Sequence, residues 1–130
     1  MDNRSLRPFA FVLAVRDFDA TAKYFHEALG FDVQWIDASD WRLVSRGQVN
    51  VMIGRCPDVT PAREVGDHSY FAYLQVEDVD AMHAELSNRG AIIRMPPTDR
   101  PYGQREMVVA TPDGHRMVIG QPLSLTASQN

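Results

Sequence analysis

The stretch Val15-Arg16-Asp17-Phe18-Asp19-Ala20 (VRDFDA) decides the fold, because it returns later in the chain as Val76-Glu77-Asp78-Val79-Asp80-Ala81 (VEDVDA). Each copy follows an apolar run and precedes a pattern typical of an amphipathic helix. Further on, Val51-Met52-Ile53-Gly54 has a near copy in Met117-Val118-Ile119-Gly120. Two copies of one unit predict a duplicated domain rather than a solenoid, which needs more repeats.

Two helices are predicted from apolar side chains at helical spacing, which are Phe18, Ala22, Phe25 and Leu29 in the first and Val79, Met82 and Leu86 in the second. An aspartate is expected to cap each helix by accepting backbone N–H bonds. The candidates are Asp17 or Asp19 for the first helix and Asp78 or Asp80 for the second. Gly30 and Gly90 are expected to end the helices in the left-handed conformation.

Short strands are expected on both sides of each helix. The run Phe9–Val15 precedes the first helix, and the strands predicted after it are Phe31–Asp37, Trp41–Arg46 and Val49–Gly54. A fifth strand, with His68 at its start, precedes the second helix, and Ala91–Met95, Arg105–Thr111 and Arg116–Gly120 follow it. Asp113-Gly114 supplies a tight turn between the last two strands. The order β-α-β-β-β, twice, predicts an α+β fold of two tandem βαβββ modules.

The predicted boundaries give a single domain over residues 7–123. Module one covers about 7–54, and module two about 69–123. Between them, residues 55–68 hold prolines and charged side chains and are interpreted as a linker. The polar ends, 1–6 and 124–130, are expected to be flexible.

The composition is that of an ordinary globular protein. Of its 130 residues, 45% are hydrophobic and 23% are charged. The net charge of −4 argues against a nucleic-acid partner, since nucleic-acid binders carry a basic face. Cys56 is the only cysteine, which excludes an internal disulfide and suits a reducing compartment, so a cytoplasmic location is expected. The apolar run Phe9–Val15 is too short to span a bilayer and lacks a signal-peptide cleavage site, so no membrane partner is expected.

Four motifs in this order resemble the glyoxalase/bleomycin resistance/dioxygenase, or vicinal oxygen chelate, superfamily. They are Val15-Arg16-Asp17, Leu29-Gly30-Phe31, Pro101–Glu106 and Pro112-Asp113-Gly114, within a match that covers most of the chain. The resemblance implies that each module's sheet curls into a half-barrel, that the halves form a cleft, and that the protein is a homodimer. Relatives include metal-dependent isomerases, dioxygenases, thiol transferases, epimerases and metal-free drug-binding proteins, so the fold does not choose a function.

The resemblance also places four metal-ligand positions, on the first and last strands of each module. Here they hold Ala10, Met52, Phe71 and Val118. The metals of this family need imidazole or carboxylate donors, which these side chains do not supply. No metal and no cofactor are therefore expected, although a shift of one or two residues in the alignment would bring in Asn50 or Arg116.

The remaining polar candidates are weak. His26 and His83 lie off the apolar helix stripes and are interpreted as solvated, whereas His68 and His115 are candidates for a cleft rim. No HExxH motif, Ser-His-Asp pattern or phosphate-binding glycine loop is present. Glu106 could act as a base if it were buried, but as a strand charge at the surface it needs no function. The catalytic residues are therefore unknown.

Strand alternation predicts a cleft floor on strands one and five, where Ala10, Val12 and Ala14 meet Phe71 and Tyr73, and places Phe11 on the helix side. An apolar floor with a few polar groups is the usual makeup of a small-molecule pocket. The predicted ligand-binding residues are Trp35, Trp41, Asn50, Phe71, Tyr73, Tyr102 and Arg116. The two tryptophans would equally suit a core or a dimer interface.

Three functions are compatible with the sequence. The first is a metal-free protein that binds a drug or metabolite of aromatic or cationic character. The second is an enzyme, either a metal-dependent glyoxalase-like lyase, isomerase or dioxygenase or a metal-free lyase. The third is a dimerisation module only. The apolar metal positions favour the first.

Overall fold

The predicted order of elements is confirmed by the computed structural model, which describes residues 4–35, 39–66 and 70–123. Module one contains β1 (Phe11–Val15), α1 (Phe18–Leu29), β2 (Asp32–Trp35), β3 (Trp41–Arg46) and β4 (Val49–Arg55). A short 3₁₀ helix, Ala62–Glu64, lies in the predicted linker. Module two contains β5 (Tyr70–Gln75), α2 (Val79–Arg89), β6 (Ile92–Arg100), β7 (Gln104–Ala110) and β8 (Arg116–Pro122).

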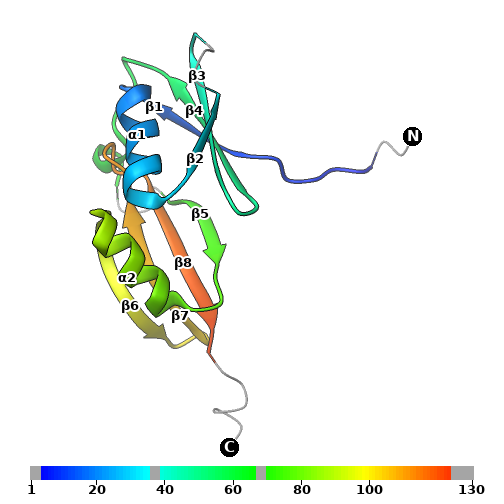
Figure 1. Cartoon of the computed structure of the whole chain (residues 1–130), viewed down its shortest axis with the longest axis vertical. Helices are drawn as coiled ribbons and strands as arrows, with labels where there is room; N and C mark the ends of the chain where they lie inside the picture. Colours follow the sequence, from blue (N-terminus) through cyan, green and yellow to red (C-terminus); the bar gives the residue numbers. More distant parts are fainter. Residues whose placement is uncertain (1–3, 36–38, 67–69, 124–130) are drawn as a thin grey trace, which may run out of the picture.

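Each module forms one four-stranded mixed sheet with the same topology. The strand orders are β1-β4-β3-β2 and β5-β8-β7-β6, with β1–β4 and β5–β8 parallel and the other pairs antiparallel. Both helices lie on one side of the molecule (Figure 1). The sheets curl but do not close into barrels, so each leaves one face uncovered by its helix. The α+β fold of two βαβββ modules is thus shown.

Of the two aspartates predicted as candidate caps for each helix, Asp17 caps α1 and Asp78 caps α2. Asp17 accepts a hydrogen bond from the backbone N–H of Ala20, and Asp78 accepts one from Ala81, each at 3.0 Å. These bonds satisfy donors that the first helical turn leaves free. Gly30 ends α1 with φ of 76°, a left-handed conformation that glycine adopts without a Cβ clash.

Alternation along the strands separates the core from the open faces. Leu13 and Val15 of β1 are 2% and 0% exposed and join the core with Phe18 and Phe25 of α1. Val12, which precedes Leu13, is 59% exposed on the opposite face. In β7 all residues from Glu106 to Ala110 are buried, and Met107 and Val109 belong to the core.

The strand predicted over Ala91–Met95 is longer in the structure. β6 runs on through Pro96 and Pro97 to Arg100, with irregular register against β7. Proline cannot donate to a ladder, but β6 is an edge strand of its sheet, where only one side needs partners. This extension brings Arg100 to the open face of module two.

Side chains at the junction clamp the two modules together. The Tyr24 hydroxyl of α1 donates to the carbonyl of Ala110 at 2.6 Å and accepts from the N–H of Ile92 at 2.9 Å. Arg46 forms two hydrogen bonds with Glu85 of α2, at 2.9 and 2.8 Å. These contacts fix one module against the other.

The Pro112-Asp113-Gly114 turn is part of the same junction. Asp113 is buried, and its carboxylate accepts from the Arg16 backbone N–H at 3.1 Å and from Arg16 Nη2 at 3.0 Å. The N–H of Arg63, in the predicted linker, donates to the carbonyl of Asp113. The turn therefore ties module one, the linker and module two together.

Some predictions fall on residues that lie outside the described ranges. These residues are 1–3 and 124–130 of the predicted flexible ends, His68, and 36–38, which include the end of the strand predicted over Phe31–Asp37. Within the described ranges, none of the helices has the length and apolar character needed to cross a membrane.

Candidate functional site

The open face of the second sheet contains a hollow of about 640 Å³, here named the module-two hollow. All four strands of this sheet contribute side chains, and Phe11 joins them from β1. The residues that line it are Phe11, Tyr70, Phe71, Ala72, Tyr73, Met95, Arg100, Tyr102, Glu106, Val108 and Val118. The lining is mostly aromatic and aliphatic, with a carboxylate and a guanidinium placed among these groups.

Glu106 is the central polar group of this hollow. It lies on β7 between Arg105 and the core residue Met107, its side chain points to the open face, and the residue is only 5% exposed. The Tyr73 hydroxyl donates to Glu106 Oε2 at 2.7 Å, and the Tyr102 hydroxyl donates to Oε1. A buried charge requires such partners.

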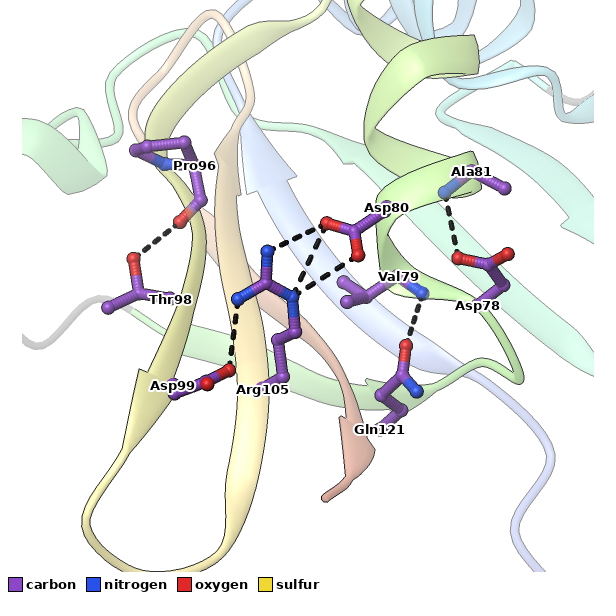
Figure 2. Close-up of polar contacts among 9 residues, drawn as sticks. All are labelled: Asp78, Val79, Asp80, Ala81, Pro96, Thr98, Asp99, Arg105 and Gln121. Carbon is purple, nitrogen blue, oxygen red and sulfur yellow. Dashed lines mark hydrogen bonds and ion pairs between the residues drawn. The ribbon is translucent and has the colours of Figure 1, made fainter. Parts of the chain in front are cut away.

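Neighbouring Arg105 shows why Glu106 faces the hollow. The Arg105 guanidinium lies on the helix side, where it contacts Asp80 at the start of α2 and Asp99 on β6, each at 2.9 Å (Figure 2). Because successive strand side chains point to opposite faces, anchoring Arg105 to α2 directs Glu106 toward the open face.

Glycine makes room for the Glu106–Tyr73 pair. Gly120 on β8 lies opposite Glu106, and a Cβ there would lie 3.1 Å from Glu106 Cβ and 3.2 Å from the Tyr73 hydroxyl. Gly54, its counterpart in the repeat, has the same relation to Trp41, because a Cβ there would come within 2.9 Å of the ring. Both glycines thus admit an aromatic side chain onto an open sheet face.

The hydrogen bonds alter the chemistry of the tyrosines. Partial desolvation of its hydroxyl, and then the hydrogen bond to the Glu106 carboxylate, raise the pKa of Tyr73 to about 12. The Glu106 hydrogen bond also raises the pKa of Tyr102. Both phenols therefore stay protonated at neutral pH and act as donors to the carboxylate.

Arg100 is the second charged residue that lines the hollow. Its Nε lies 3.8 Å from Glu106 Oε1, beyond hydrogen-bond distance. This nitrogen is buried, and no described residue accepts its hydrogen. A buried donor without an acceptor is costly, and sites with such groups need an explanation.

Three of the predicted ligand-binding residues meet in this hollow: Phe71, Tyr73 and Tyr102. The Phe71 ring lies edge-on to Phe11 at 6.1 Å and to His115 at 6.3 Å. Phe11, predicted to face only the helices, thus also borders the site. Burial lowers the pKa of His115, so at neutral pH its ring acts mainly as an uncharged neighbour of the hollow.

The other predicted site residues lie elsewhere. Trp41 borders a separate hollow of about 320 Å³ with Val12 and Ala14, so the predicted common floor is divided in two. The Asn50 amide accepts from Ser45 Oγ at 2.6 Å and donates to the carbonyl of Phe9 at 3.0 Å. The remaining two are placed only by strand register: Trp35 at the end of β2 opposite Leu43, and Arg116 at the start of β8 opposite Tyr70.

The two histidines that were interpreted as solvated differ in their exposure. His26 is exposed, but its Nδ1 lies 2.7 Å from the carbonyl oxygen of Phe31. His83 is half-buried. Neither borders the module-two hollow, so the site chemistry rests on other groups.

The residues at the four metal-ligand positions do not fit a metal. Met52, Phe71 and Val118 are half-buried side chains of β4, β5 and β8, and Ala10 directly precedes β1. They offer three hydrocarbon side chains and one thioether, not the nitrogen and oxygen donors that Zn²⁺, Mn²⁺ or Fe²⁺ prefer. Within residues 4–35, 39–66 and 70–123, no three His, Cys, Asp or Glu side chains gather to hold an ion.

A further cavity of about 500 Å³ lies between the modules. It is bordered by the β3–β4 turn, β5 and α2, and core residues such as Leu86 and Met117 form its wall. Its guanidinium, from Arg46, is already bonded to Glu85 and to the carbonyl of Leu29. The module-two hollow is the better candidate site because its polar groups retain hydrogen-bonding capacity.

The fold and the hollow together define a duplicated βαβββ protein with an aromatic-lined site on its second sheet. The chain belongs to the Glyoxalase/Bleomycin resistance protein/Dioxygenase superfamily, whose family model matches residues 7–119. The resemblance seen in the sequence motifs is thereby confirmed.

Solved structures with this fold include proteins that bind antibiotics. TnmS3, an antibiotic binding protein from Streptomyces sp. CB03234, is 23% identical with a TM-score of 0.73, covering 93% of this chain and 99% of that chain. UcmS2 is 21% identical with a TM-score of 0.73, covering 89% and 98%. The bleomycin-binding protein of bleomycin-producing Streptomyces verticillus, complexed with copper(II)-bleomycin, is 25% identical with a TM-score of 0.67, covering 92% and 98%. No curated protein matches the sequence.

Proposed function

We propose that this protein binds a small aromatic molecule, a drug or a metabolite, in the module-two hollow without the help of a metal. The observation that carries the proposal is the hollow itself, in which Phe71, Tyr73, Tyr102 and Val118 surround a buried carboxylate. Aromatic walls with a few fixed polar groups are the usual composition of a ligand pocket. The antibiotic-binding proteins that share the fold support the same class of ligand.

Binding is favoured over catalysis by the chemistry of the polar groups. The four apolar side chains at the metal positions speak against a metal-dependent isomerase or dioxygenase. Glu106, the residue that a metal-free lyase would use as a base, already accepts hydrogen bonds from two hydroxyls. The site is therefore better suited to holding a molecule than to removing a proton from it.

We also propose that the protein is a cytoplasmic homodimer. Large apolar or aromatic side chains gather on the open faces of both sheets, with Val12 59%, Trp41 39%, Tyr73 52% and Tyr102 62% exposed. Exposed apolar patches of this kind are typical of interfaces or ligand sites. Light scattering should give the mass of two chains; a monomer mass over a wide concentration range would overturn this part of the proposal.

The ligand proposal is tested with 2-methoxynaphthalene as the probe, by isothermal titration of the wild type and two tryptophan variants. Val118→Trp places a large ring in the hollow and should weaken binding at least about tenfold, the loss expected when about 1.4 kcal/mol of contact is removed. Ala84→Trp is the matched control, because Ala84 is exposed on α2. Equal affinity in the wild type and Val118→Trp would show that the hollow is not the site.

A further inference from the structure

We propose that the module-two hollow selects a ligand whose polar group is uncharged and both donates and accepts a hydrogen bond, such as a phenolic hydroxyl or a primary carboxamide. This inference rests on the proposed function and specifies the chemical class of the ligand. It follows from which hydrogens around Glu106 are already used, which are unused, and how the charges balance.

The tyrosine hydrogens are already used. A phenol has one O–H hydrogen, and those of Tyr73 and Tyr102 both point to Glu106. Toward the hollow, these oxygens and the carboxylate therefore present lone pairs only. Each carboxylate oxygen has two acceptor positions, so Glu106 retains one on each side after the tyrosines have bonded. A ligand group at this point must donate a hydrogen.

The unused hydrogen belongs to Arg100. Its buried Nε–H lies 3.8 Å from Glu106 Oε1, and no described residue accepts from it. Because Nε is buried, the Arg100 side chain, which is 40% exposed, must turn to present it to the hollow. A ligand oxygen beside both atoms would then accept from Nε and donate to Oε1 at about 2.7–3.0 Å each, which a separation near 3.8 Å permits. One hydroxyl, or the oxygen and nitrogen of one carboxamide, satisfies both requirements.

Charge argues against an ionic group. The negative carboxylate of Glu106 is matched by the guanidinium of Arg100, so the pair leaves no net charge for a ligand cation or anion to neutralise. An ionic group would lose its hydration on entering an aromatic-lined hollow without gaining an unpaired counter-charge. A neutral ligand group that both donates and accepts a hydrogen bond avoids this loss of ionic hydration.

A matched series of naphthalenes tests the selection by isothermal titration at pH 7. 2-Naphthol donates and accepts, 2-methoxynaphthalene only accepts, and naphthalene does neither. 2-Naphthoate and 2-naphthylmethylammonium carry the two charges. We expect 2-naphthol to bind at least about tenfold more tightly than 2-methoxynaphthalene, the factor typical of one hydrogen bond to a charged acceptor. It should also bind more tightly than either ion.

Three variants test whether Glu106 and Arg100 cause the preference for 2-naphthol. Glu106→Gln should reduce the gap between 2-naphthol and 2-methoxynaphthalene to about threefold or less, because a neutral acceptor is weaker. Glu77→Gln removes the same charge at an exposed position and should keep the gap. Arg100→Lys retains the charge but lacks Nε–H, so it should weaken both oxygen-bearing probes several-fold and leave naphthalene unchanged. Arg100 is 40% exposed, so this variant is expected to fold.

The outcomes separate the two levels of the proposal. Equal binding of naphthalene, 2-methoxynaphthalene and 2-naphthol, all weakened by Val118→Trp, would overturn the selection and keep the binding site. Tightest binding by the ammonium or the carboxylate would do the same. Binding of none of the five, or binding that Val118→Trp leaves unchanged, would overturn the site itself and the selection with it.

Discussion

A pair of valine-to-tryptophan substitutions on neighbouring strands distinguishes an open hollow from packed core. Val118 on β8 is half-buried and lines the module-two hollow, whereas Val109 on β7 is 0% exposed within the hydrophobic core. The two substitutions add the same side-chain volume to opposite faces of one sheet. Only the hollow face has about 640 Å³ of space to receive it.

The expected losses of unfolding free energy in the two variants differ several-fold. Overpacking a filled core costs about 1–3 kcal/mol and sometimes more, so Val109→Trp should lose about 3 kcal/mol. Val118→Trp should lose less than about 1 kcal/mol, because the new ring enters open space between Tyr73 and Val108. For a domain of this size, 1 kcal/mol corresponds to a shift of about 3–5 °C in Tm.

Thermal unfolding followed by circular dichroism, supported by urea titration, measures both variants against the wild type. We expect Tm to fall by about 10 °C in Val109→Trp and by at most about 4 °C in Val118→Trp. If Val118→Trp unfolds as readily as Val109→Trp, the open face is filled in solution, and the reasoning that assigns a ligand site to it fails.

Three further predictions concern Asp113, Tyr73 and the metal positions. Burial acts to raise the pKa of Asp113, but the hydrogen bonds and the charge of Arg16 outweigh it and hold that pKa below its usual range. The stability that this contact supplies is therefore present above about pH 4 and is lost as the pH falls through the lowered pKa. The gap in unfolding free energy between the wild type and Asp113→Asn should therefore shrink from pH 5 toward about pH 2, and a constant gap would contradict this. In an ultraviolet titration, the wild type should contain a tyrosine that ionises near pH 12 and that is missing from Tyr73→Phe. If Tyr73→Phe instead lacks a tyrosine that ionises near pH 10, Tyr73 is not bonded to Glu106. Elemental analysis of the purified protein should find no stoichiometric divalent metal, and about one Zn, Ni, Mn or Fe per chain would overturn the reading of the metal positions.

Much of the fold could be predicted because its signals are local. The aspartate caps, the glycines that end the helices and the apolar stripes all act within one or two turns of chain. Alternation correctly placed Val12 on an open face and Leu13 in the core. The extension of β6 through Pro96 was missed because proline usually ends a strand, and edge position is a property of the whole sheet.

The site was only partly predictable because it depends on contacts between distant residues. Phe71, Tyr73 and Tyr102 were expected to bind a ligand, and the structure brings them together. Arg100 was missed, and Glu106 was considered as a base but interpreted as a surface charge, since a strand glutamate is usually exposed and its burial depends on Tyr73, 33 residues away. The counterpart glycines of the repeat, Gly54 and Gly120, were the available signal for aromatic groups on both open faces.

Mapping a bound probe onto the chain shows whether the module-two hollow is the binding site. 2-Naphthol would be titrated into ¹⁵N-labelled protein and the amide chemical shifts followed. We expect the largest shifts at Tyr73, Val108 and Val118, on three adjacent strands of one sheet. Shifts concentrated at Trp41 and its neighbours, or between the modules, would contradict it, as would a spectrum that does not change.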